Sequence, residues 1–156
     1  MKGNGNKFKL PRPMINSNNL EMSFSGLKTA VLTLVNQCGG IERLDEQTKA
    51  DIAIAFQQAI VDVLIVKSIN ALKKSGYRQL VIAGGVGANQ ELRIKLREQA
   101  AKIGAVVFYP PLEFCTDNGA MIAFAGAQRI SEGTYFDSGN NFTVKPRWDL
   151  ESIGLI

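Results

Sequence analysis

The sequence predicts an α/β fold, and the order of elements in its second half carries that prediction. Apolar runs at residues 78–83 and 105–110 are typical of buried strands. A helical pattern follows each run, at residues 90–103 and 120–131. This strand–helix–strand–helix order favours layered packing with the two strands parallel. The 156 residues are enough for one domain with its own core or for two small subdomains.

The N-terminal part predicts a loop, a short strand and a helix. Residues 1–20, rich in Gly, Asn, Pro and Lys, are expected to form a loop or frayed terminus. Residues 20–24 alternate between apolar and polar side chains, which predicts a short strand. A helix is then expected over residues 27–37, with Ser25 as its N-cap and Gly39 ending it.

A longer helix is expected in the middle of the chain. Thr48 is the candidate N-cap, the helix runs over residues 49–75, and Gly76 ends it. Its middle is apolar almost all round, which predicts packing on two sides rather than one. After the last predicted helix, residues 141–148 are expected to form a short strand or an extended arm.

Composition limits the chemistry that this sequence can carry. It has 46% hydrophobic and 21% charged residues and a net charge of +4, which is typical of a globular domain and compatible with phosphate or RNA partners. It has no histidine, so a Ser-His-Asp triad, a Cys-His pair, an HExxH zinc site and a histidine base are excluded within it. Two distant cysteines, Cys38 and Cys115, favour a reduced, cytoplasmic protein. The longest apolar run, residues 59–66, is too short to span a membrane, so no membrane partner is expected.

A glycine-rich turn separates the first strand of the second half from its helix. Gly84, Gly85 and Gly87 would let a ligand approach the backbone, and the start of a helix offers free N–H groups to an anion. Asn89 stands where the helix begins, so its side chain either caps the helix or binds a ligand. The turn lacks the third glycine of dinucleotide-binding loops and the Gly-Lys-Ser/Thr of phosphate-binding loops. By itself it also fits a plain tight connection between a strand and a helix.

A second polar turn precedes the last predicted helix. Asp117 is either a helix cap or the residue just outside the cap, or else an acidic metal ligand or general base. Because neighbouring parallel strands open into one crevice at their carboxyl ends, residues 84–89 and 116–119 are expected to face the same cleft. Lys28, near the start of an earlier helix, is a weaker candidate for binding an anion, and its simplest role is a solvated charge.

Five segments, in their order and spacing, resemble one known family. They are PRP at residues 11–13, SFSGLKTAV at 23–31, LVIAGGVGANQELR at 80–93, EFCTDNGAMIA at 113–123 and VKPRW at 144–148. Together they resemble the TsaD family, the bacterial tRNA N6-adenosine threonylcarbamoyltransferases, long labelled O-sialoglycoprotein endopeptidases or glycoproteases. The resemblance implies a ribonuclease-H-like lobe of the actin, sugar kinase and Hsp70 (ASKHA) superfamily, with a mixed sheet and flanking helices. On that basis residues 21–150 form the C-terminal lobe of a two-lobed enzyme, residues 1–20 a loop or linker, and residues 151–156 a tail.

The resemblance also implies a reaction and partners. A threonylcarbamoyl group passes from threonylcarbamoyl-AMP, made in a pathway that uses ATP, to the exocyclic amine of the adenosine 3′ of the anticodon in tRNA. Members of the family carry a divalent metal, iron or zinc, held by two histidines and one aspartate. The partners implied for this chain are tRNA, the subunits TsaB and TsaE, and its own N-terminal lobe.

The resemblance assigns roles to five residues and leaves the catalytic residues unassigned. Asp117 matches the metal-binding aspartate, and Asn89 matches an asparagine that contacts the adenylate. Gly84, Gly85 and Gly87 line the nucleotide side, although Gly87 stands where other members can have serine. The family's two histidines belong to an N-terminal lobe that this sequence lacks. The chain alone is therefore expected to be inactive, to bind metal weakly, and to self-associate through exposed apolar surface.

Other functions stay open beside this one. An ATP-binding kinase or ATPase lobe would share the implied fold, and a noncatalytic assembly module would share the implied partners. A metalloprotease, the older label, is disfavoured by the absence of histidine. In the tail, Arg147 and Trp148 are candidates for contact with tRNA, while the simpler role of Trp148 is packing within the core or against the other lobe.

Overall fold

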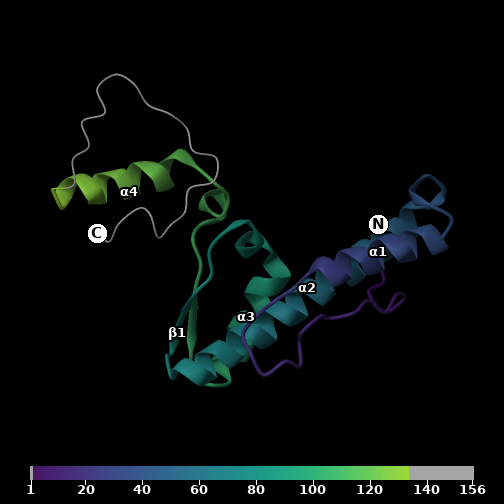
Figure 1. Cartoon of the computed structure of the whole chain (residues 1–156), viewed down its shortest axis with the longest axis horizontal. Helices are drawn as coiled ribbons and strands as arrows, with labels where there is room; N and C mark the ends of the chain where they lie inside the picture. The colour runs from purple at the N-terminus through teal and green to yellow at the C-terminus, as the bar shows by residue number, and fades with distance from the viewer. Residues whose placement is uncertain (1, 134–156) are drawn as a thin grey trace. The chain divides into compact units, whose positions relative to one another are not determined.

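A computed structural model of the chain describes residues 2–133 (Figure 1). The strand or arm expected at residues 141–148, with Trp148 and Arg147, lies outside the described residues. The chain divides into two compact units, Met1–Cys115 and Thr116–Ile156. The first unit contains the two strands and three of the longer helices.

The first helix, α1 (Ser25–Gln37), confirms the helix predicted in this region. It ends before Gly39, whose φ of 98° is a conformation that side chains disfavour. Two expectations at its start are wrong. The cap position is Phe24 rather than Ser25, and no side chain caps the helix. Residues 20–24 form no strand, because none of the described strands lies beside them to complete a hydrogen-bonded ladder.

The long central helix, α2 (Glu46–Ser75), begins three residues earlier than predicted. Asp45 is its N-cap, and the Asp45 side chain accepts a hydrogen bond of 2.6 Å from the backbone N–H of Thr48. Thr48 is therefore not the cap but the residue that the cap binds. The same hydrogen bond lowers the pKa of the Asp45 carboxyl below its usual value. At the other end Gly76 has a φ of 74° and ends the helix as predicted.

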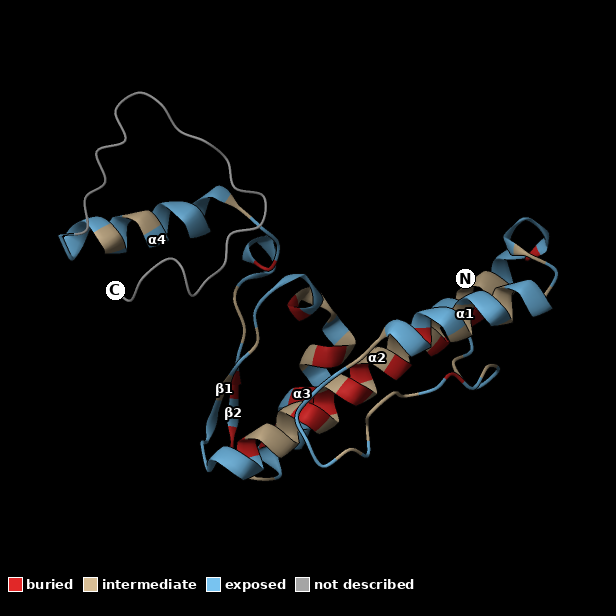
Figure 2. Ribbon diagram, viewed as in Figure 1, coloured by how far each residue is buried: buried red, intermediate tan, exposed pale blue. Residues whose placement is uncertain are grey.

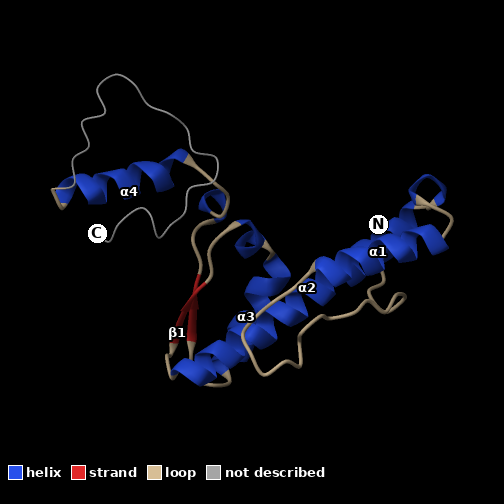
Figure 3. Ribbon diagram, viewed as in Figure 1, coloured by secondary structure: helices blue, strands red, loops and turns tan. Residues whose placement is uncertain are grey.

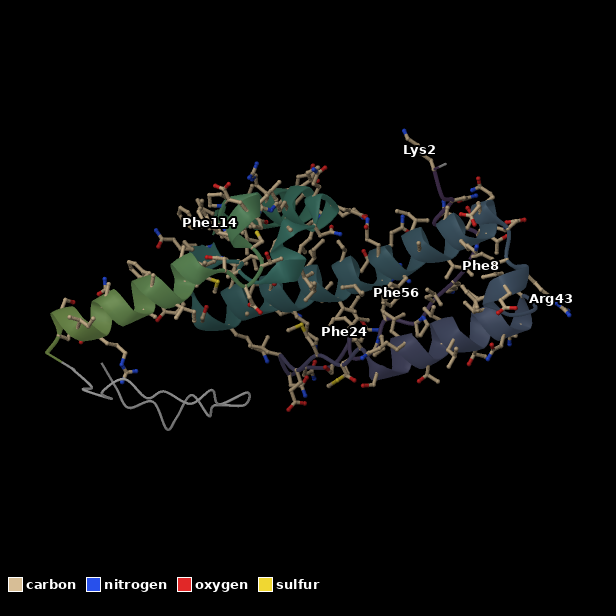
Figure 4. The ribbon with its side chains drawn as sticks, turned by 90° about the horizontal axis from the view of Figure 1, so that it is seen from above. Lys2, Phe8, Phe24, Arg43, Phe56 and Phe114 are labelled. Atoms are coloured by element: carbon tan, nitrogen blue, oxygen red, sulfur yellow. The ribbon has the colours of Figure 1, made fainter. Side chains whose placement is uncertain are left out.

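The prediction that α2 packs on two sides is confirmed by two separate apolar clusters along it (Figure 2). Toward its N-terminal end the buried residues are Ala55 and Ala59 of α2, Leu27 of α1 and Leu10 of the preceding loop. Phe8 and Phe56 lie between α1 and α2 in this region (Figure 4). Toward its C-terminal end, α2 contributes Val61, Ile65 and Leu72 to a core with the third helix and the second strand. By length and composition alone α2 is also apolar enough to cross a membrane, a test that core helices of soluble proteins pass as well.

The N-terminal segment lies against α2 without forming a helix or strand. A Cβ atom added at Gly3 would meet the carbonyl oxygen of Ala50 at 2.1 Å, so only glycine fits there. The carboxylate of Asp51, in α2, is buried beneath this segment. It accepts hydrogen bonds from the backbone N–H of Asn4 (2.7 Å), the ammonium of Lys7 (2.9 Å) and the amide of Gln47 (2.7 Å). These bonds, that of Asn4 first, lower the pKa of Asp51 to about 2.

The strand–helix–strand order predicted for the second half is confirmed (Figure 3). β1 (Gln79–Val81), α3 (Gln90–Ala101) and β2 (Val106–Phe108) follow one another, and the two strands pair in parallel with Leu80 opposite Val107. Leu80 and Val107 pack on the cluster formed by α2 and α3. One face of the sheet is thereby covered.

The other face of this sheet is open within the first unit, contrary to the prediction of buried strands. Val81 is 69% exposed, Val106 56% and Phe108 49%. Parallel strands are usually covered on both faces, which is why their apolar runs predict burial. Here the strands are also shorter than the predicted runs, three residues each.

The second unit contains one described helix, α4 (Gly119–Ser131), as predicted. The side chain of Asn118 caps it by accepting a hydrogen bond of 3.1 Å from the N–H of Met121. Gly133, with a φ of 79°, follows its C-terminal end. None of the residues of α4 is buried, and Ile122 and Phe124 are among its exposed apolar side chains.

Candidate functional site

The glycine turn after β1 consists of one position whose backbone conformation favours glycine, followed by one tight helical turn. Gly84 has a φ of 84° and a ψ of 171°, a conformation that is strained for residues with a side chain. The next four residues, Gly85–Ala88, form a 3-10 turn, in which the N–H of Gly87 donates to the carbonyl of Gly84 at 2.9 Å. Gly87 is buried, and a Cβ there would lie 3.5 Å from Ile82. Gly87 thus packs the turn against the end of the strand.

The backbone N–H groups at the front of this turn remain open to a ligand. Within the described residues, no hydrogen bond is recorded for the N–H of Gly85 or of Val86. A Cβ added at Gly85 would meet nothing within 4 Å, so there is space in front of it. Two such N–H groups side by side can hold the oxygens of a phosphate or carboxylate.

Asn89 caps α3, which is one of the two roles considered for it. Its Oδ1 accepts a hydrogen bond of 2.9 Å from the N–H of Leu92. The cap uses only the oxygen: in the described part of the chain the amide Nδ2 of Asn89 has no recorded partner. The same side chain can therefore cap the helix and donate a hydrogen bond to a ligand.

A hollow of about 520 Å³ lies beside the turn, between it and α2. Its walls are mainly apolar. Phe56, labelled in Figure 4, lines the hollow from α2 together with Ile60 and Val61. Val86 and Asn89 line it from the side of the glycine turn. A cavity of this size and character is in the range of small-molecule sites. An apolar wall next to free N–H groups suits a ligand with a flat ring at one end and an anionic group at the other.

Arg93, on the first turn of α3, holds the glycine turn in place, and sequence reasoning missed it. Its Nε donates to the carbonyl of Gly87 at 2.6 Å. Its Nη2 lies 2.9 Å from the carbonyl of Pro110 and 3.1 Å from the sulfur of Cys115. The guanidinium also stacks on the ring of Tyr109, 4.8 Å from its centroid. One side chain thus ties the turn after β1 to the segment after β2.

The second predicted site residue, Asp117, belongs to the second unit. It is exposed and stands just outside the cap of α4, because Asn118 takes the cap position. That was one of the alternatives for Asp117. The expectation that Asp117 and the glycine turn face one cleft stays a prediction, because the two lie in different units.

A metal centre does not fit the described residues by themselves. No group of three His, Cys, Asp or Glu side chains gathers anywhere in residues 2–133, and Asp117 is a single exposed carboxylate. A lone carboxylate does not hold a catalytic ion, which needs several protein ligands. Lys28, the third candidate, is exposed on the first turn of α1.

The fold and the turn define a class of protein: an α/β lobe with a candidate ligand site where a parallel strand meets a helix. A family model described as TsaD, tRNA N6-adenosine threonylcarbamoyltransferase, matches residues 1–124. The chain therefore belongs to the TsaD family, as its five motifs predicted.

Curated relatives agree with the family match. Proteins named tRNA N6-adenosine threonylcarbamoyltransferase are 57% identical over 155 residues in Chromobacterium violaceum and 59% identical over 155 residues in Herminiimonas arsenicoxydans. One in Nitrosomonas eutropha is 54% identical over 153 residues. The matches cover 97–99% of this chain but only 44–45% of each relative. The chain thus spans less than half the length of the curated relatives it matches.

Proposed function

We propose that this chain supplies the C-terminal part of a transferase that moves a threonylcarbamoyl group from threonylcarbamoyl-AMP to tRNA. The acceptor is the exocyclic amine of the adenosine 3′ of the anticodon. The family match over residues 1–124 carries the proposal, and the relatives' name states the same group and the same class of acceptor. An ASKHA-type lobe, active in the cytoplasm, is the fold and setting proposed with it.

In this proposal the glycine turn and its hollow hold the adenylate half of the donor. The N–H groups of Gly85 and Val86 bind phosphate oxygens, and the nucleoside lies against the apolar wall that includes Phe56. The Nδ2 of Asn89 donates to the ligand while its Oδ1 keeps α3 capped. Arg93 positions the turn through the carbonyl of Gly87.

The chemical step itself asks the protein mainly for positioning. The amine nitrogen attacks the carbonyl carbon of the mixed anhydride, a new C–N bond forms, and the C–O bond to phosphate breaks. AMP leaves with the electron pair, and the amine loses one proton. Because the anhydride is already activated, holding the donor still and keeping water away contribute most.

The relatives extend well beyond this chain, so the proposed activity needs the rest of the enzyme. The chain alone is expected to be inactive and to need an N-terminal lobe, together with the proposed partners TsaB and TsaE. The metal of the family, iron or zinc, would take most of its ligands from that lobe, since Asp117 is the one matching residue here.

Reconstitution of activity tests the proposal. The chain is mixed with the separately produced N-terminal part of the Chromobacterium violaceum relative, threonylcarbamoyl-AMP and an unmodified tRNA transcript. Formation of threonylcarbamoyladenosine is read by mass spectrometry of the nucleosides. Product is expected from the mixture and not from either part alone.

Asn89 offers a variant that separates the cap from the ligand contact. Asn89→Ser keeps a good N-cap but lacks the amide donor, so helix stability should be retained while transfer falls about tenfold, the worth of one hydrogen bond. Asp45→Ser, a cap exchange at the start of α2 outside the proposed site, is the control. Full activity of Asn89→Ser in an active mixture would remove Asn89 from the site.

An ATP-binding lobe is the second candidate, because the same turn and hollow would also suit ATP. In the reconstituted enzyme, protection of the turn from proteolysis by ATP and Mg²⁺, with no effect of a threonylcarbamoyl-AMP analogue, would favour that alternative. The transferase proposal expects the reverse preference.

A further inference from the structure

A second surface of the first unit carries positive charge that the proposed reaction leaves unused. Residues 67–104 hold eight lysines and arginines against two glutamates. Several of these cations belong to the turn where α2 ends and β1 begins, and Figure 1 shows the course of the backbone there. We name as the turn patch the residues Lys73, Lys74, Tyr77, Arg78 and Lys102.

The members of the turn patch are neighbours in space. Lys74 lines one hollow with Lys73 and a second hollow with Tyr77. The guanidinium of Arg78 donates a hydrogen bond to the carbonyl of Ile103, the residue after Lys102. The cluster is therefore continuous from the end of α2 to the end of α3.

The charges of the turn patch are open to solvent. All five residues are exposed. In residues 2–133 none of its cations forms an ion pair, and the recorded partners of Lys74 and Arg78 are backbone carbonyls. Unpaired cations so close together repel one another, and a bound polyanion relieves that repulsion.

An aromatic ring and an apolar hollow accompany these charges. Tyr77 is 73% exposed, and it borders a hollow of about 450 Å³ that also includes Leu20, Leu72 and Leu80. A flat base can stack on an exposed ring, and stacking contributes to binding of unpaired nucleotides whatever their sequence. Cations beside the ring hold the phosphates on either side of that base.

We propose that the turn patch binds single-stranded RNA, with one unpaired base stacked on Tyr77 and the flanking phosphates held by Lys73, Arg78 and Lys102. The choice of RNA rests on the proposed function, since the relatives are named for action on tRNA. The patch lies at the opposite end of β1 from the glycine turn. RNA bound there leaves the glycine turn open to its own ligand.

Binding of a labelled RNA to the 156-residue chain tests this proposal without any need for transfer. The probes are a fluorescein-labelled single-stranded 12-nucleotide RNA and the same RNA in a duplex, measured by anisotropy over a series of KCl concentrations. The single strand should bind more tightly than the duplex. Lys73→Gln/Arg78→Gln/Lys102→Gln should weaken binding and reduce the salt slope by about 2, given about 0.7 per phosphate contact. Tyr77→Leu should weaken binding at least about fivefold while leaving the slope unchanged.

Matched variants make each outcome informative. Lys2→Gln/Lys9→Gln/Arg43→Gln removes three exposed charges outside the turn patch and should leave binding nearly unchanged. If loss of the contact between Arg78 and Ile103 unfolds the triple variant of the turn patch, the double variant Lys73→Gln/Lys102→Gln repeats the test with Arg78 in place. Circular dichroism checks the fold of each variant.

Three results would overturn the proposal: no binding of single-stranded RNA at low salt, equal losses in the two triple variants, or an unchanged affinity in Tyr77→Leu. Binding to phosphatidylserine vesicles without binding to RNA would also overturn it, and would assign the patch to membranes. If the turn patch binds RNA but the reconstituted enzyme makes no product, the proposed function fails and this inference stands.

Discussion

Replacing Arg93 by alanine measures how firmly the glycine turn is held. The change removes three hydrogen bonds, to the carbonyls of Gly87 and Pro110 and to the sulfur of Cys115, and the stacking on Tyr109. A hydrogen bond that involves a charged group contributes about 1.5–3 kcal/mol, and a cation over an aromatic ring about 0.5–1 kcal/mol at an exposed site. Because Arg93 is half-buried and these bonds share one guanidinium, the contributions do not add fully. We expect a loss of about 2–4 kcal/mol in the free energy of unfolding.

Urea unfolding of the chain, followed by far-ultraviolet circular dichroism, gives this quantity. Arg97→Ala is the matched control: Arg97 is exposed and stands 6.0 Å from the same ring, with no recorded hydrogen bond in the described part of the chain. The change in the free energy of unfolding of Arg97→Ala should stay within about 0.5 kcal/mol, as for most surface substitutions. Arg93→Lys keeps the charge but not the planar fork and should recover only part of the stability. A loss in Arg93→Ala no larger than that in Arg97→Ala would refute the positioning role.

Three further changes test the structure around the site. Leu96→Ala should cost about 2–5 kcal/mol of stability in urea unfolding, because Leu96 is fully buried, whereas the exposed Ile94→Ala should cost under about 1 kcal/mol. Gly84→Ala should cost about 1–2 kcal/mol of stability through its positive φ alone. Gly85→Ala should be nearly neutral, because a Cβ there meets no neighbour and Gly85 has no positive φ. Equal losses in the two variants would contradict the backbone strain assigned to Gly84. Asp51 has a folded pKa of about 2 against a usual 3.8, so its contribution is complete above pH 4 and is lost as the pH falls toward 2. Thermal unfolding across that range should be less pH-dependent in Asp51→Asn, and an unchanged profile would contradict the assignment.

Local signals in the sequence predict most helix ends and miss those where two caps compete. Gly76 ends α2 and Asn89 begins α3 as expected, because a positive φ and a side-chain cap are local properties. Asp45 and Thr48 are both good N-cap residues, three positions apart. The longer helix is the one formed, since Asp45 then accepts the N–H of Thr48. Nothing local distinguishes these two starts.

Burial is harder to predict from the sequence than element type. Val81 and Val106 have the apolar character of a covered strand, yet the face that carries them is open within the first unit. Conversely, Asp51 and Lys67 are charged residues in a helix and would be expected at the surface. Both are buried, because the N-terminal segment folds over α2 and supplies their hydrogen-bond partners, such as Ser17 for Lys67. Burial of a side chain by a segment that is distant in the sequence cannot be predicted from the local pattern of apolar and polar residues.

The candidate site was predicted in outline and not in its supporting contacts. Glycines and Asn89 between a strand and a helix are visible in the sequence, so the turn was found. The contacts of Arg93 with Pro110 and Cys115 join residues 17 and 22 positions apart, and only the fold brings them together. The apolar wall around Phe56 comes from α2, which precedes the turn by many residues. Sequence reasoning had no means to find it.

The most direct test of the account is to observe the glycine turn while the donor binds. The chain, labelled with ¹⁵N and mixed with the N-terminal part of the Chromobacterium violaceum relative, is titrated with a non-hydrolysable analogue of threonylcarbamoyl-AMP and followed by nuclear magnetic resonance. The account predicts saturable shifts of the backbone amides of Gly85 and Val86 and of the side-chain amide of Asn89. Saturable binding of the analogue with all three signals unmoved would contradict it.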